Sequence, residues 1–295
     1  MTLSEPLIAP LPSPPAPSPA RPSSAAPPAR TRGPVAARSD GPHVRLGLAW
    51  AGGTLVVALL GIGPMAVWMG AAAALAALQV ARSARRAPQR PSPPLAAAGA
   101  ALVPLAAVAG WAGCASGIAM AAVLALLAGR LHAVSGARRR GTSGGQGPAA
   151  GTIGMVARRT GVLAIFFGLA AAAPVLLLRQ GLTVVLVLLA LLAAYDASVY
   201  IVGTGAGAAW EGPAAGVAAV GSLTLGVAAI LVPPFRGAAP WVLGGLTAVL
   251  APAGVATASR LIVDPETPVQ GARRLDSLLL AGPAWAVLAV ALLGR

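Results

Sequence analysis

Residues 182–202 read LTVVLVLLALLAAYDASVYIV, an almost unbroken apolar run with a single carboxylate, Asp196. An α-helix rises about 1.5 Å per residue, so about 20 apolar residues cover the roughly 30 Å hydrocarbon core of a bilayer. Similar windows recur along the chain, which is 57% hydrophobic and 9% charged. Soluble proteins carry about 25% charged residues. The sequence therefore predicts an all-α, polytopic transmembrane helical bundle.

We expect about nine membrane spans. The alternative is that spans one and two, or three and four, are short or re-entrant pairs, because alanine is barely hydrophobic on insertion scales. A disordered tail is predicted over 1–45, which is rich in Pro, Ala, Ser and Arg and too poor in apolar residues to offset the entropy of folding. N-terminal transmembrane helices follow over 46–131, then a basic cytoplasmic loop over 132–159 and a second transmembrane domain over 160–295. The expected spans are 46–61, 65–81, 95–111, 116–131, 161–178, 182–202, 214–232, 240–258 and 278–293.

The arginines predict the orientation of these spans. With a cytoplasmic N-terminus, 18 of the 21 basic residues, all arginine, fall in cytoplasmic segments, as the positive-inside rule requires. The same topology places 203–213 and 259–277 on the cytoplasmic side of a multi-pass plasma-membrane protein. The net charge of +14 does not indicate nucleic-acid binding, because the basic residues lie in short connections without interleaved aromatic residues.

Five of the seven acidic residues lie in the last hundred positions. A carboxylate inside a membrane segment is costly and therefore a functional candidate. Asp196 lies about two turns before the cytoplasmic end of its span, and Tyr200 shares its helix face. The alternative is that Asp196 only hydrogen-bonds a neighbouring helix. Trp210 and Glu211 follow a Gly-rich stretch, which is read either as a ligand-binding turn or as a flexible connection with Trp210 as an interfacial anchor.

The loop before the last span alternates carboxylates with arginines. This pattern suits a metal–phosphate site, because carboxylate oxygens hold Mg²⁺ and Arg binds phosphate. The alternative is a solvated loop whose charges neutralise one another, with Asp276 favourably placed at a helix N-terminus. The candidate residues of this loop are Ser259, Arg260, Asp264, Arg273, Arg274, Asp276 and Ser277.

Three ordered blocks carry a resemblance: Asp-x-x-x-Tyr-x-x-Gly at 196–203, Trp-Glu-Gly at 210–212 and Leu-Asp-Ser-Leu-Leu-Leu-Ala-Gly-Pro at 275–283. Over residues 160–295 they resemble the phosphatidate cytidylyltransferases (CDP-diacylglycerol synthases). The resemblance implies transfer of CMP from CTP to phosphatidic acid in phospholipid biosynthesis, giving CDP-diacylglycerol and pyrophosphate. It implies Mg²⁺ as cofactor and CTP and membrane phosphatidic acid as partners, and it is compatible with a homodimer.

The resemblance also gives roles to individual residues. Asp196, Glu211 and Asp276 would be catalytic, and Mg²⁺ would be held by Asp196, Asp264 and Asp276. The substrate-binding residues would be Tyr200, Trp210, Ser259, Arg260, Arg273, Arg274 and Ser277.

The last loop departs from the family pattern. Arg273-Arg274 stands where the family has Asp-Arg, and neither a His nor a Gly-Gly pair occurs between Asp264 and Asp276. Losing a carboxylate and gaining a cation weakens Mg²⁺ binding. A second hypothesis is therefore a catalytically inactive paralogue that acts as a membrane scaffold or lipid-binding protein. A third class, a secondary transporter, would need midplane polar sites in both halves, and the first four expected spans have no ionisable residue in their middles.

Overall fold

A computed structural model describes residues 42–87, 89–140, 150–264 and 267–293, and these residues form helices and turns without a strand. The all-α prediction is thus confirmed for this part of the chain. The predicted disordered tail lies outside it up to residue 41, and the last part of that tail, residues 42–45, is helical in the structure. The described helices are α1 (Pro42–Leu60), α2 (Ile62–Ser83), α3 (Pro93–Ala106), η1 (Ala107–Ala109), α4 (Trp111–Arg140), α5 (Ala150–Gln180), α6 (Leu182–Gly203), α7 (Glu211–Ile230), α8 (Ala239–Leu261), η2 (Ala272–Arg274) and α9 (Leu278–Leu293).

Each predicted span coincides with one of these α-helices. Among the described residues, six helices are long and apolar enough to cross a membrane, namely α2, α4, α5, α6, α7 and α8. The other three, α1, α3 and α9, contain shorter apolar stretches. The protein is therefore of the multi-pass membrane type. The segment 132–159, predicted to be a loop, is partly helical, because α4 continues to Arg140 and α5 begins at Ala150.

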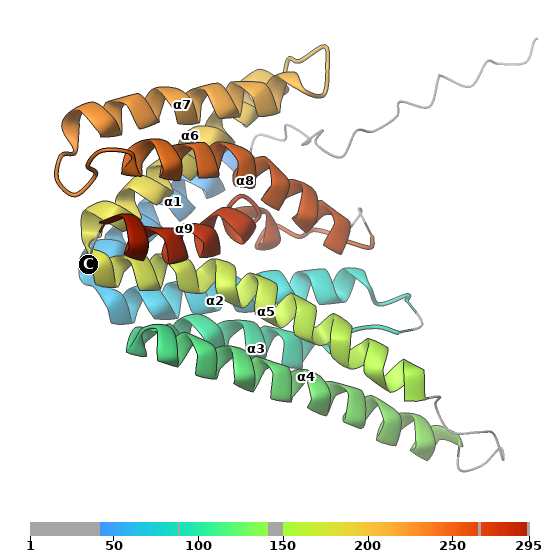
Figure 1. The fold of residues 1–295 in the computed structure, drawn as a ribbon. Coiled ribbons are helices and arrows are strands. Elements are labelled where there is room, and N and C mark those ends of the chain that lie inside the picture. Colours follow the sequence, from blue (N-terminus) through green and yellow to red (C-terminus); the bar gives the residue numbers. More distant parts are fainter. Residues whose placement is uncertain (1–41, 88, 141–149, 265–266, 294–295) are drawn as a thin grey trace, which may run out of the picture. The chain divides into compact units, whose positions relative to one another are not determined.

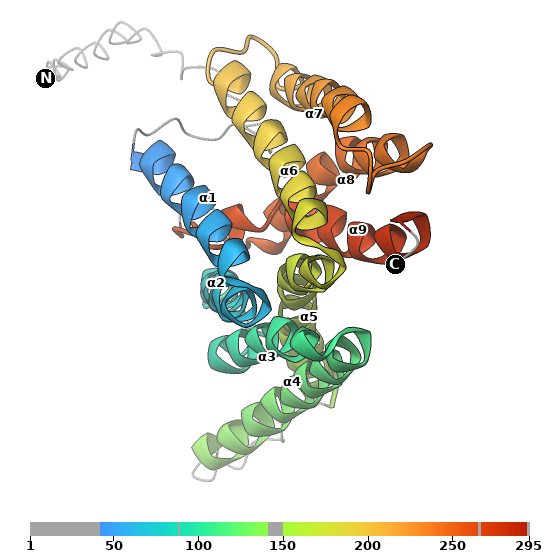
Figure 2. The same cartoon turned by 90° about the vertical axis from the view of Figure 1, so that its left-hand side faces the viewer.

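Helix α5 lies at the centre of the packing, with α2, α3, α4, α6 and α9 around it (Figure 2). Within its most apolar window 72% of the helix is buried, compared with 22% for α7. Residues 170–173 of α5 are four consecutive alanines, each at most 1% exposed. Small side chains let helix backbones approach closely, which is how helices associate in lipid.

The helices alternate in direction, so their connections gather at two ends. Figure 1 shows the C-terminal ends of α2, α4 and α8 on one side and those of α5, α7 and α9 on the other. At the first end, Arg159 Nη1 donates to the Gln89 carbonyl at 3.1 Å, which joins α5 to the α2–α3 connection. At the other end, Arg179 Nη1 donates to the Val108 carbonyl.

We call the first end the basic end, because most arginines of the described segments lie there. Those with described side chains are Arg45, Arg82, Arg85, Arg86, Arg90, Arg130, Arg158, Arg159, Arg260, Arg273 and Arg274. Arg179 and Arg236 lie at the opposite end. The two ends therefore differ strongly in charge.

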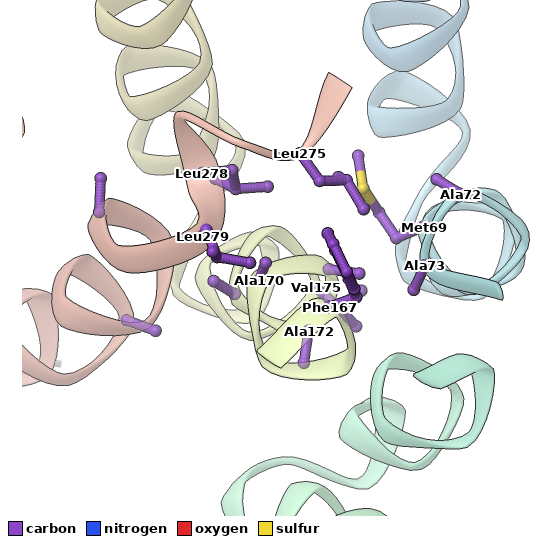
Figure 3. Close-up of a cluster of buried hydrophobic side chains, with 14 of the residues drawn as sticks. Met69, Ala72, Ala73, Phe167, Ala170, Ala172, Val175, Leu275, Leu278 and Leu279 are labelled. Atoms are coloured by element: carbon purple, nitrogen blue, oxygen red, sulfur yellow. The ribbon is translucent and has the colours of Figure 1, made fainter. Parts of the chain in front are cut away.

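The connection from α8 to α9 is anchored inside the bundle. Leu275 is fully buried and points toward Met69 of α2, while Leu278 and Leu279 pack toward α5, where Phe167 is also fully buried (Figure 3). Burying a leucine side chain contributes about 2 kcal/mol. This apolar anchor fixes the two polar residues that follow Leu275 in the sequence.

Candidate functional site at the basic end

The first and third sequence blocks meet through a hydrogen bond. Ser277 Oγ donates to Asp196 Oδ2 at 3.0 Å, although the two residues are 81 positions apart. The Ser277 backbone N–H donates to Asp276 Oδ1 at 2.8 Å. A single serine therefore links both carboxylates, one from α6 and one from the connection before α9.

Close packing with α8 positions this group. A Cβ added to Gly254 would lie only 2.4 Å from the Asp276 carbonyl oxygen, so the backbone of the connection lies directly on α8. Ser277 is 3% exposed, whereas Asp276 is half-buried and Asp196 is exposed. The serine is therefore fixed by the core, whereas Asp196 retains exposed surface on α6.

The two neighbouring arginines contribute positive charge to the pair. The charge of Arg274 acts on Asp196, and that of Arg273 acts on Asp276. Burial raises the pKa of Asp276, which lies between α8 and α9, and the nearby Asp196 carboxylate raises it further. The pair therefore resists carrying two negative charges at once, and a bound cation would relieve that repulsion.

The donor set fits Mg²⁺. This ion is usually held by one or two protein carboxylates together with water and substrate phosphates. Asp196 and Asp276 are two such carboxylates, and they would hold the ion. When bound, Mg²⁺ would supply positive charge that stabilises a leaving pyrophosphate. Within the described ranges, no group of three or more His, Cys, Asp or Glu side chains is arranged to hold a metal.

Asp264, predicted as a third metal ligand, belongs to a different set of contacts. Its Oδ2 accepts a hydrogen bond from Thr267 Oγ1 at 3.2 Å, and its side chain lines a cavity beside Arg82 and Arg86 at the end of α2. The structure thus groups Asp196 with Asp276 and assigns Asp264 to the neighbouring cavity. The spacing of acids along a loop does not reveal which helix the loop lies against.

Glu211, predicted to be catalytic, holds its own loop. Its carboxylate oxygens accept from the backbone N–H groups of Gly207 at 3.2 Å and Ala208 at 3.0 Å. Trp210 precedes α7 and is 69% exposed, as an interfacial anchor would be. These contacts account for the Trp-Glu pair by local structure.

The remaining predicted residues lie at helix ends of the basic end. Tyr200 is half-buried, one turn beyond Asp196 on α6. Ser259 Oγ donates to the Val255 carbonyl at 2.9 Å within α8, and Arg260 is exposed at the end of that helix. In the described part of the chain, none of these three side chains hydrogen-bonds to Asp196 or Asp276.

Sequence reasoning missed the contributions of α2 and Gly254. Gln79 Oε1 accepts from the Gly271 N–H at 2.8 Å, and Ser83 Oγ accepts from the Val263 N–H at 3.2 Å. These bonds join residues 192 and 180 positions apart, so no local sequence pattern predicts them. The one available signal was Gln79, a polar residue that follows the long apolar part of α2.

No known family model, curated protein or solved structure matches this chain.

Proposed function

We propose that this chain is a divergent phosphatidate cytidylyltransferase-like membrane protein that transfers CMP from CTP to phosphatidic acid. The observation that carries the proposal is the Ser277–Asp196 hydrogen bond of 3.0 Å. It joins the two most specific blocks of the family resemblance at a single point. Such a meeting of distant polar residues in an apolar bundle supports a functional site over two isolated structural acids.

The proposed chemistry asks mainly for positioning and charge. A phosphate oxygen of phosphatidic acid attacks the α-phosphorus of CTP, the bond from that phosphorus to the β-phosphate bridging oxygen breaks, and pyrophosphate leaves. Arg273 and Arg274 would bind phosphate oxygens and stabilise the charge that develops on the leaving group. Ser277 would orient the Asp196 carboxylate, and Leu275 would hold the connection in place.

We assign the basic end to the cytoplasm, in the plasma membrane. Arginine-rich connections favour the cytoplasmic side of a membrane protein, and the opposite end carries few of the described arginines. CTP is a cytoplasmic nucleotide, so this orientation gives the Asp196–Asp276 pair access to it.

A second candidate is a non-catalytic, lipid-binding paralogue. It is favoured by the composition of the pair's surroundings, since two arginines and two carboxylates leave no net negative charge to attract a metal ion. Such a protein would retain binding of the lipid phosphate through Arg273 and Arg274 and would lack turnover.

The test is formation of CDP-diacylglycerol from labelled CTP and phosphatidic acid by the purified full-length protein with Mg²⁺. We expect turnover in the wild type and a loss of at least about a hundredfold in Asp276→Asn, the scale of removing one electrostatic group from such a site. Ser222→Ala is the control, because Ser222 is exposed on α7 and bonds only the Ala218 carbonyl. Background turnover in the wild type, with retained lipid binding, would favour the second candidate.

A further inference from the structure

A cavity of about 440 Å³ lies at the basic end, between the end of α2 and the connection that follows α8. It shares no lining residue with the Asp196–Asp276 pair. Among the described residues, three arginines and one carboxylate, Asp264, line it. Ser83 and Thr267 add hydroxyl groups to the lining. The cavity therefore combines excess positive charge with neutral hydrogen-bonding groups.

The three arginines are Arg82, Arg85 and Arg86, and their guanidinium groups make no hydrogen bond or ion pair with any other residue in the described part of the chain. Cations at a helix C-terminus are favoured by the helix dipole. Only Arg82 lies in the last turn of α2, so the dipole accounts for one of the three. The cavity thus has three cations without a hydrogen-bond or ion-pair partner among the described residues.

The walls of the cavity are held in place by polar contacts. The Val263 N–H donates to Ser83 Oγ at 3.2 Å, and the Gly271 N–H donates to Gln79 Oε1 at 2.8 Å. A Cβ on Gly271 would lie 3.0 Å from Leu75 Cγ, so the connection fits tightly against α2. The arginines therefore project beside a fixed surface.

Apolar surface adjoins these charges. Val263 is 59% exposed and directly precedes Asp264, and Leu75 is 47% exposed on α2 below Gln79. Helix α2 is long and apolar enough to cross a membrane, and the cavity lies at its end. In a membrane, this position would be at the level where lipid headgroups meet their acyl chains. Basic pockets at the ends of membrane helices bind anionic lipid headgroups.

We propose that this cavity binds the phosphate-bearing headgroup of an anionic phospholipid, with Arg82, Arg85 and Arg86 as phosphate contacts and Leu75 and Val263 against the acyl chains. The bound lipid would tie α2 to the connection that carries Asp276. This site is separate from the proposed cytidylyltransferase site and does not depend on its activity.

The experiment measures retention of phosphatidylglycerol by the full-length protein in detergent, using native mass spectrometry. Phosphatidylglycerol is anionic and is not the substrate proposed above. Any binding through Arg273 and Arg274 would contribute equally to the variants compared, so a difference between them reports on the cavity. We compare Arg82→Gln/Arg86→Gln with Arg130→Gln/Arg158→Gln, which removes the same charge from exposed positions of the same end. The pocket variant should bind about tenfold or more weakly, and the control variant should bind as the wild type does.

A second variant distinguishes loss of the binding site from misfolding. Asp264→Asn removes the cavity's carboxylate while keeping an oxygen that accepts from Thr267, so it should strengthen phosphatidylglycerol binding about fivefold. Damage to the fold would not strengthen binding. Equal binding by the pocket and control variants, or equal retention of phosphatidylcholine, would overturn the proposal. Displacement of the lipid by inorganic phosphate at the lipid's own concentration would assign the cavity to a free phosphate compound and overturn its assignment to a lipid.

Discussion

The backbone carbonyl oxygen of Asp276 lies against Gly254, so closely that a Cβ at position 254 would come within 2.4 Å of it. Gly254→Ala must therefore push the connection away from α8. We expect a loss of about 1–3 kcal/mol of stability, as for other overpacked sites, measured as a lower Tm in detergent. Gly245→Ala in the same helix is the control, because its Cβ would meet nothing within 4 Å. Equal effects of the two substitutions would contradict the close approach.

Stability should depend on pH through Asp276. Because its folded-state pKa is raised, the folded protein keeps a proton that the unfolded chain has already lost. Stability should therefore fall as pH rises above about 4, the ordinary range of aspartate, and continue to fall up to the raised pKa. In Asp276→Asn the Tm should vary less steeply with pH, whereas Ser222→Ala should follow the wild type. An unchanged slope in Asp276→Asn would show that Asp276 titrates normally.

Glu211 should order the loop before α7. Glu211→Ala removes both acceptors of the Gly207 and Ala208 N–H groups, so their hydrogen exchange should accelerate roughly tenfold. Glu211→Gln keeps one oxygen acceptor and should accelerate exchange less. The Thr204 N–H, which donates to the Tyr200 carbonyl in the same loop, is an internal reference that should not change. Protected Gly207 and Ala208 amides in Glu211→Ala would refute this role.

The orientation of the bundle can be read by cysteine labelling in intact cells. Cys114 is 2% exposed, so Cys114→Ala provides a background without a native thiol. In that background, Arg236→Cys at the opposite end should react with a membrane-impermeant maleimide, and Arg85→Cys should react only after permeabilisation. The reverse pattern would place the basic end outside the cytoplasm and remove the access of CTP to the Asp196–Asp276 pair.

The sequence located the apolar part of each helix, because apolar runs bounded by Gly, Pro and Arg define it directly. It did not reveal the polar extensions of α4 to Arg140 and of α5 from Ala150. It was less informative about which helices cross a membrane, since α1, α3 and α9 contain only short apolar stretches. The packing of α5 at the centre depends on its alanines fitting against neighbours, and this follows from tertiary contacts that periodicity does not reveal.

The candidate site was predictable only in part. The family resemblance implied that Asp196 and Asp276 share one Mg²⁺, and in the structure Ser277 hydrogen-bonds to both carboxylates. The position of Asp264 was not expected, because it depends on hydrogen bonds between α2 and the connection that follows α8. The role of Glu211 was also not predictable. An acid beside a Gly-rich stretch can either bind a ligand or accept hydrogen bonds from its own loop, and the sequence does not distinguish the two.

The most direct measurement is a double-mutant cycle on CDP-diacylglycerol formation with Asp196→Asn and Ser277→Ala. If the 3.0 Å hydrogen bond serves one catalytic unit, each single variant should lose most turnover, and the double variant should lose little more than the worse of the two. Turnover at wild-type level in both single variants, or losses that simply add, would contradict a shared site at Asp196 and Ser277.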